Sequence, residues 1–231
     1  MKKMICLTLF AAGLLMANDG RGSCLAAAWK DIGRGIDDTD LKTIAIDPAA
    51  TQVVYAGSAK YIYKSADGGQ SWKRVHMTAG ASRGISVICV DPNDSNLVYA
   101  GTGRGLFASY DEGSGWKRIF EGLDASEKQV RHLAVEQADS KRMYLGTLGG
   151  LFVSVDGGKS WNKSQGGIPD AAINFIAVDP RDPNIVYAAA GSGIYKTNSR
   201  GISWDRIFIV SGQESGIEAG GSAAIDPVTK I

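Results

Sequence analysis

Cysteine and histidine are scarce in this 231-residue chain, which holds three cysteines and two histidines. Cys6 and Cys24 lie in the first 28 residues, and Cys89 lies further on, inside the apolar run SVICVD. A single remaining cysteine allows no disulfide framework, and its apolar setting favours a buried structural thiol over a nucleophile. His76 and His132 are too far apart in sequence to form a metal motif. We therefore expect no metal and no cofactor.

The chain also lacks an excess of charge of either sign, with 25 basic and 24 acidic residues. Without its first 28 residues it keeps 22 basic and 23 acidic residues, a net charge of −1. A near-neutral chain gives no electrostatic reason to bind nucleic acid or an anionic membrane. We expect its partner to be an unidentified protein or glycan.

Residues 1–28 have the layout of a secretory signal peptide. Lys2 and Lys3 precede the apolar run MICLTLFAAGLLMA, and the small residues CLAAA follow a short polar stretch. We expect cleavage between about Ala26 and Ala28, export to the periplasm or beyond, and no membrane-spanning segment afterwards. The alternatives are a buried first helix and a lipid anchor through Cys24. The anchor is disfavoured because Arg21 stands where a lipoprotein signal has leucine.

The rest of the chain is built from repeats. An octet occurs as SADGGQSW (65–72), SYDEGSGW (109–116), SVDGGKSW (154–161) and TNSRGISW (197–204), with tryptophans 44, 45 and 43 residues apart. Phrases such as IAIDP, VVYAG and IYKS precede each octet. A fourth phrase such as WKRV begins at the tryptophan of the octet and continues after it. They are rich in β-branched and aromatic residues and are bounded by Asp-Pro or Gly, which is typical of strands. No window has the apolar spacing of a helical repeat.

Four strands in about 45 residues are typical of one blade of a β-propeller. We predict an all-β propeller over residues 29–231, with four-stranded blades at about 41–76, 84–120, 130–163 and 173–210. A further blade would begin at 222–231, and Trp29 resembles the outer strand of a blade without its other strands. Rings of this kind close with about six to eight blades. We therefore expect an incomplete propeller.

The octet matches the pattern Ser/Thr-x-Asp-x-Gly-x-Ser/Thr-Trp, except that Gly115 and Ser199 replace the second Ser/Thr and the Asp in one copy each. It resembles the Asp-box, or BNR repeat. In an Asp-box we expect the carboxylate to accept backbone N–H groups, the glycine to be left-handed and the tryptophan to cover the turn. Because a catalytic acid is needed only once, we interpret the repeated positions as structural: Ser65, Asp67, Gly69, Trp72, Ser109, Asp111, Gly113, Trp116, Ser154, Asp156, Gly158, Trp161, Thr197, Gly201 and Trp204.

Asp-boxes occur in sialidases, in xyloglucan-cleaving glycoside hydrolases, in the sortilin ectodomain and in photosystem II assembly factors. The sequences of these repeats are most similar to those of secreted bacterial BNR proteins, with the assembly-factor and xyloglucanase types next. Because enzymes and non-enzymes share the motif, the resemblance implies a fold and not a reaction.

In related propellers, ligand sites lie at the edge that carries the links between blades, opposite the Asp-box hairpins. On this resemblance, the ligand-binding candidates in the links and nearby turns are Arg83, Arg104, Arg131, His132 and Asn174. We expect an exported, non-catalytic scaffold that binds a protein or a glycan. One alternative is an assembly factor for a photosystem-type membrane complex, which would show an arginine patch at the propeller axis.

The other alternative is a glycoside hydrolase fragment. Sialidase chemistry is disfavoured because the sequence has no Arg-Ile-Pro segment and no tyrosine in the links. Glycoside hydrolysis needs two carboxylates about 5–10 Å apart. Asp124 and Asp170 are weak candidates for this pair, since nothing in their spacing singles them out. We assign no catalytic residue.

Overall fold

Four sheets make up the structure, a computed structural model that describes residues 33–38, 40–75, 84–191 and 193–209. These residues form sixteen strands and no helix. Each sheet is a four-stranded antiparallel meander, with its strands in chain order from one side to the other. The predicted all-β fold with four-stranded blades is confirmed.

Each blade takes four consecutive strands of the chain. The first contains β1 (Leu41–Ile46), β2 (Val54–Ser58), β3 (Ile62–Ser65) and β4 (Lys73–Val75). The second contains β5 (Ile85–Val90), β6 (Val98–Thr102), β7 (Gly105–Ser109) and β8 (Lys117–Phe120). The third contains β9 (Val130–Val135), β10 (Met143–Thr147), β11 (Gly150–Ser154) and β12 (Asn162–Lys163). The fourth contains β13 (Ile173–Val178), β14 (Val186–Ala190), β15 (Gly193–Thr197) and β16 (Asp205–Ile209).

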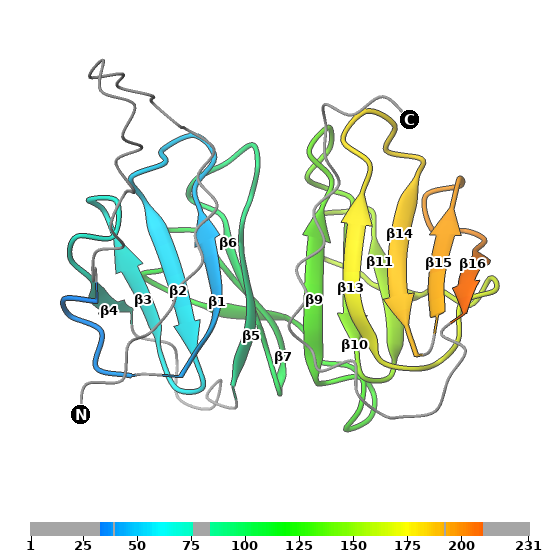
Figure 1. Ribbon diagram of the computed structural model, residues 1–231, viewed down its shortest axis with the longest axis horizontal. Coiled ribbons are helices and arrows are strands. Elements are labelled where there is room, and N and C mark those ends of the chain that lie inside the picture. Colours follow the sequence, from blue (N-terminus) through cyan, green and yellow to red (C-terminus); the bar gives the residue numbers. More distant parts are fainter. Residues whose placement is uncertain (1–32, 39, 76–83, 192, 210–231) are drawn as a thin grey trace, which may run out of the picture.

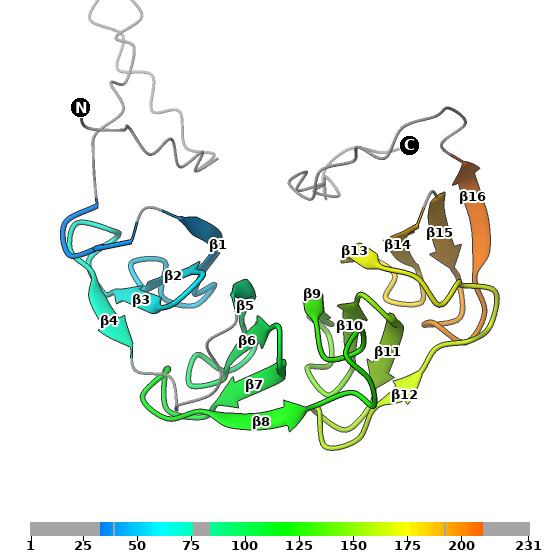
Figure 2. The same ribbon diagram turned by 90° about the horizontal axis from the view of Figure 1, so that it is seen from below.

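The blades stand side by side (Figure 1), and together they form an arc (Figure 2). Figure 2 shows β1, β5, β9 and β13 on the concave side of the arc and β4, β8, β12 and β16 on the convex side. The inner strands contact one another from blade to blade, β1 with β5, β5 with β9 and β9 with β13. The predicted signal peptide, Trp29, Arg83 and the further blade predicted at 222–231 lie outside the described residues.

The hydrophobic core lies between blades. At the junction of the second and third blades, the Phe120 ring lies 4.8 Å from the Phe152 ring and 5.7 Å from the Trp161 ring. Corresponding clusters join the first blade to the second and the third to the fourth. Strands β2, β6 and β10 are buried along their whole length because both sides of their sheets are covered. Burying this apolar surface provides the main drive for the blades to associate.

A glycine in each of the first three blades lets the next blade approach. A Cβ added to Gly57 would lie 2.7 Å from Cγ2 of Ile85, and one added to Gly101 would lie 2.4 Å from Cγ1 of Val130. A Cβ added to Gly146 would lie 2.8 Å from the carbonyl oxygen of Ile173 in the fourth blade. No real Cβ approaches another atom so closely. The glycine of the VYAG phrase is therefore required by packing between blades.

Candidate functional site

Each blade presents two different edges. The linker edge carries the links between blades and the turns between second and third strands, where Leu148 N–H donates to the Gln129 carbonyl at 3.0 Å. The Asp-box edge carries the octets and the turns between first and second strands. There Gly68 N–H donates to the Gln52 carbonyl at 2.8 Å, and the other three boxes repeat this bond.

The first Asp-box is a closed hydrogen-bonded hairpin. Asp67 Oδ1 accepts from the Ser71 N–H at 2.9 Å and from the Ser65 hydroxyl at 2.8 Å, while Oδ2 accepts from the Ser71 hydroxyl at 2.6 Å. The Ser65 hydroxyl oxygen in turn accepts from Gly69 N–H at 2.8 Å. The Trp72 indole donates to the Gly69 carbonyl at 3.0 Å. The expected bond from a backbone N–H group to the carboxylate is present, and the Ser65 and Ser71 hydroxyls add two bonds that the sequence analysis did not foresee.

The second Ser/Thr of the box affects the pKa of the box aspartate. Hydrogen bonds, first of all from the Ser71 and Ser160 hydroxyls, lower the pKa of Asp67 and Asp156 to about 2. The pKa of Asp111 is lowered chiefly by the Ser109 hydroxyl, since Gly115 supplies only an N–H. All three carboxylates are thus held ionised, unlike a general acid, whose pKa must lie near the working pH.

The fourth box keeps its turn without an aspartate. Ser199 Oγ accepts from the Ser203 N–H at 3.0 Å, which is the bond that Asp67 makes in the first box. Thr197 takes the place of Ser65 and accepts from Gly201 N–H at 3.1 Å. Loss of the aspartate has therefore not opened the hairpin.

Carboxylates that the sequence analysis did not single out tie the blades together on the Asp-box edge. Asp47 accepts from the Ser95 hydroxyl of the second blade at 3.0 Å, and Asp91 accepts from the Ser140 hydroxyl of the third at 2.6 Å. Both carboxylates are buried. The sequence did indicate these contacts, because an Asp or Glu follows every inner strand, but the sequence analysis used the Asp-Pro pair only as the mark of a turn.

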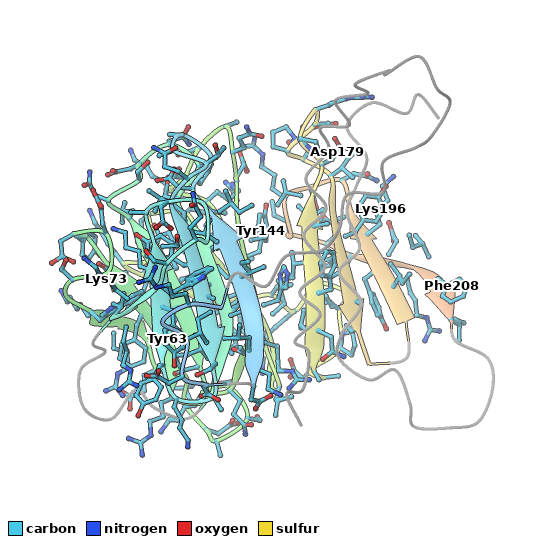
Figure 3. The ribbon with its side chains drawn as sticks, turned by 60° about the vertical axis from the view of Figure 1, so that its left-hand side comes forward. Tyr63, Lys73, Tyr144, Asp179, Lys196 and Phe208 are labelled. Atoms are coloured by element: carbon cyan, nitrogen blue, oxygen red, sulfur yellow. The ribbon has the colours of Figure 1, made fainter. Side chains whose placement is uncertain are left out.

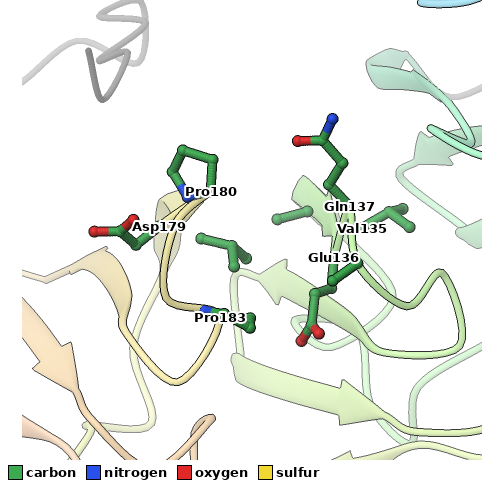
Figure 4. Close-up of a pocket in the computed structure, with 9 residues that line it drawn as sticks. Val135, Glu136, Gln137, Asp179, Pro180 and Pro183 are labelled. Carbon is green, nitrogen blue, oxygen red and sulfur yellow. The ribbon is translucent and has the colours of Figure 1, made fainter. Parts of the chain in front are cut away.

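The junction of the third and fourth blades departs from this scheme. Pro183 stands where the second and third blades have serine, and Glu136 pairs instead with Arg200 at 3.6 Å and Arg142 at 3.7 Å. A pocket of about 200 Å³ lies there, lined by Glu136, Asp179 and Pro183 among others (Figure 4). Proline cannot donate a hydrogen bond, so the buried Glu136 carboxylate relies on longer ionic contacts.

The linker edge is organised by a bulge that recurs in every inner strand. The extra residues are Lys42, Ser86, Arg131 and Asn174, each at the start of its strand. The Ser86 hydroxyl lies 2.6 Å from a main-chain carbonyl of the third blade, and Arg131 Nη2 lies 3.5 Å from Asn174 Oδ1 in the fourth. A bulge re-aims side chains, and here it brings two predicted ligand-binding residues from different blades together.

His132 follows the Arg131 bulge. Its ring lies 4.7 Å from the ring of Phe175, at the equivalent position of the fourth blade. Within the described part of the chain, His132 Nδ1 is buried without a hydrogen-bond partner. Burial lowers the pKa of His132 to about 4, so the imidazole is neutral at physiological pH. Phe175 was missed as a site residue because an aromatic residue in an apolar phrase is typical of a strand core.

Two other candidates sit apart from this group or lie outside the structure. Arg104 lies in the turn between β6 and β7 of the second blade, where its backbone N–H donates to Thr102 Oγ1 at 3.0 Å. Arg83 is outside the described residues. The structure therefore groups Arg131, His132 and Asn174, and it places Arg104 on the linker edge of a different blade.

Asp124 and Asp170 both hold the links of the third blade. Asp124 Oδ1 accepts from Ser126 Oγ at 2.6 Å and from two N–H groups of its own turn. These bonds, led by the Ser126 hydroxyl, lower the pKa of Asp124. Asp170 pairs with Lys163 at 3.2 Å, and Lys163 also contacts the buried Glu127 at 3.2 Å. The lowered pKa of Asp124 is the opposite of the raised pKa that a general acid needs.

Other site types receive no support in the described ranges. No cluster of three or more His, Cys, Asp or Glu side chains is arranged there to hold a metal ion. No helix in those ranges has the length and apolar character needed to cross a membrane. Burial raises the pKa of the Cys89 thiol to about 12, which keeps it protonated and unreactive.

Comparison with known proteins supports the fold alone. No family model matches the chain, and no curated protein matches its sequence. Among solved structures, an ancestral GH74 enzyme is 23% identical with a TM-score of 0.63, over 75% of this chain and 24% of that one. The extracellular domain of BT4673 from B. thetaiotaomicron is 17% identical with a TM-score of 0.60, over 75% of this chain and 23% of that one. The GH74 xyloglucanase from Xanthomonas campestris is 16% identical with a TM-score of 0.50, over 77% and 40%.

The chain therefore spans about a quarter of the length of the first two of these proteins. Their likeness establishes that the four sheets are arranged as in β-propellers. Enzymes and a domain of another kind share this arrangement, so it does not decide between catalysis and binding.

Proposed function

We propose that this protein is an exported, non-catalytic propeller scaffold that binds a protein or glycan ligand at its linker edge. The observation that carries the proposal is that Arg131 Nη2 and Asn174 Oδ1 lie 3.5 Å apart, next to the His132 and Phe175 rings, which contact each other at a tilt of 51°. They come from two blades and lie on the concave side of the arc, where β9 and β13 run side by side (Figure 2).

The chemistry of this group fits a polar ligand with some apolar surface. Arg131 supplies a fork of N–H donors, and Asn174 supplies both a donor and an acceptor. A neutral His132 has one ring nitrogen that donates and one that accepts, and because its Nδ1 is buried, only Nε2 is left for a ligand. The partly exposed Phe175 ring offers apolar surface on which a sugar or a peptide side chain can pack. These groups bind and orient, and they supply no nucleophile with an activating base.

Hydrolysis has no comparable support. Asp124 is held ionised by its own turn, and Asp170 is paired with Lys163. The assembly-factor alternative needs several arginines at one place. Its candidates are Arg83, Arg104 and Arg131, and only Arg131 lies within the group described above. Export rests on the signal-peptide pattern of residues 1–28, which is a prediction from the sequence.

The proposal is tested with the purified chain on a glycan array and by affinity capture from extracts of the source organism. Arg131→Ala and Asn174→Ala are expected to abolish binding while the protein stays folded by circular dichroism. The matched control is Arg118→Ala on β8, an arginine that pairs with Glu121 at 2.8 Å on the convex side. Binding that survives both substitutions, or is lost equally in the control, would contradict the proposal.

A further inference from the structure

One side of the fourth blade is open, although the same side of every other blade is covered. Ile194 on β15 is 39% exposed and Phe208 on β16 is 54% exposed. Their equivalents in the second blade, Leu106 and Phe120, are 0% and 8% exposed. Figure 3 shows Phe208 on the last sheet, at the opposite end of the arc from Tyr63. The fourth blade therefore presents the half of a blade junction that normally receives the next blade.

The other junctions show what covers such a surface. In each, the inner strand of the following blade packs along the first and second strands of the preceding one. At each junction the glycine of the second strand leaves no room for a Cβ atom. The partners at this point are Gly57 with Ile85, Gly101 with Val130 and Gly146 with Ile173, so a large side chain fills the space above a glycine.

The fourth blade has Ala189 at the glycine position, opposite Phe175 as Gly57 is opposite Thr43. If the inner strand of a following blade began with a large residue, that residue would clash with the methyl group of Ala189. The phrase AAIDP (223–227) repeats IAVDP (176–180), and this alignment places Gly220 at the position of Ile173. The sizes are thus exchanged, with alanine on the blade and glycine on the incoming strand.

The same alignment pairs opposite charges. At the first two junctions a residue four positions after the inner-strand carboxylate of one blade reaches the carboxylate of the blade before it, as Ser95 reaches Asp47 and Ser140 reaches Asp91. The corresponding carboxylate of the fourth blade is Asp179. Four positions after Asp226 stands Lys230, a cation suited to it.

We propose that residues 220–225 of this chain form the first strand of a fifth blade and cover the inner part of the open surface of the fourth. Gly220 then lies against Ala189, and Lys230 lies beside Asp179. A second copy of the chain fits less well, because its first blade would bring Leu41 to Ala189 in place of a glycine.

Disulfide trapping in the full chain tests the contact. Ala189→Cys combined with Gly220→Cys is oxidised, digested without reduction and mapped by mass spectrometry. Mixing chains of normal and heavy isotope content separates links within a chain from links between chains. Gly101→Cys with Val130→Cys is the geometric control, because a Cβ on Gly101 lies 3.1 Å from Val130 Cβ, close to disulfide spacing. Ala189→Cys with Gly212→Cys is the negative control.

A link between positions 189 and 220 within one chain is the expected result, with none to position 212. Absence of that link while the geometric control forms would overturn the proposal. A link between chains from Ala189→Cys to Leu41→Cys would overturn it in favour of a second copy. Should the geometric control fail to fold, charge reversal decides: Asp179→Lys should lower the melting temperature and Lys230→Asp should restore it. Failure of that restoration would also overturn the proposal.

Discussion

The hydroxyl of Ser164 accepts a hydrogen bond from the Trp204 indole at 3.0 Å and donates one to the Gly201 carbonyl at 2.8 Å. In the other three boxes the indole donates directly to the carbonyl of its own box glycine. Ser164 follows Trp161 by three residues, where the preceding blades have Val75 and Ile119. The third blade thus completes the irregular box of the fourth through one hydroxyl.

Ser164→Ala is expected to destabilise the protein by about 1–3 kcal/mol, the usual cost of leaving buried polar groups unpaired. Ser164→Val should cost less, because a valine can fill the space as Val75 does beside Gly113, and the indole can then bond its own box. Urea denaturation of both variants measures the difference. A valine variant less stable than the alanine variant would contradict this account.

The regular part of the fold could be predicted because its signals are local. Asp-Pro, the VYAG phrase and the octet each mark the end of a strand or a tight turn, and these three signals recur at a period of 43 to 45 residues. Ser199 shows the limit of motif matching. It was read as a lost aspartate, yet its hydroxyl accepts the same N–H bond at 3.0 Å.

The candidate site was predicted less completely because it depends on contacts between blades. The inner-strand bulge leaves no residue pattern of its own, so nothing in the sequence announced that Arg131 and Asn174 would meet. For the same reason the Asp47 and Ser95 pairing was missed, since its partners are 48 residues apart in sequence.

Gly101→Ala tests the packing role of the repeated glycine. The new Cβ would lie 2.4 Å from Val130 and 2.6 Å from Val87, and overpacking of this kind costs roughly 1–3 kcal/mol. Adding Val130→Ala should recover part of the loss by removing the clashing methyl groups. A double-mutant cycle by thermal unfolding measures the coupling, and simple additivity of the two substitutions would contradict a direct clash.

Asp67 and Asp156 should make stability fall in acid. Their pKa values are lowered from 3.8 to about 2 in the folded protein. A lowered carboxyl pKa stabilises the fold fully above the unfolded pKa, and this contribution is lost as the pH falls through the folded pKa. Asp67→Asn with Asp156→Asn should therefore melt at a lower temperature than wild type at pH 7.

As the pH falls to about 2 and below, the melting temperatures of the wild type and this double variant should converge, because the carboxyl groups become protonated and their contribution is lost. Asp111→Asn is the matched comparison. Its box lacks the second hydroxyl, since Gly115 replaces serine, so its effect at pH 7 should be smaller. An equal gap between wild type and the double variant at pH 7 and pH 2 would count against this assignment.

His132 should destabilise the fold over a different range of pH. Burial lowers the pKa of its imidazole from 6.5 to about 4. The unfolded chain therefore takes up a proton between about pH 6.5 and 4 while the folded chain does not, and stability falls as the pH falls through this window. The loss is at most about 3 kcal/mol, from the size of the pKa change.

His132→Phe removes the titrating group and copies the aromatic residue that Phe175 supplies in the fourth blade. Its urea midpoint should change less between pH 6.5 and 4 than that of the wild type, whereas His76→Gln should keep the wild-type slope. Because folded His132 stays neutral down to about pH 4, the proposed ligand should also bind with constant affinity from pH 5.5 to 8. A wild-type midpoint that is flat over the acid window, or ligand affinity that follows a titration near pH 6.5, would show that His132 is solvated and does not form part of a dry binding surface.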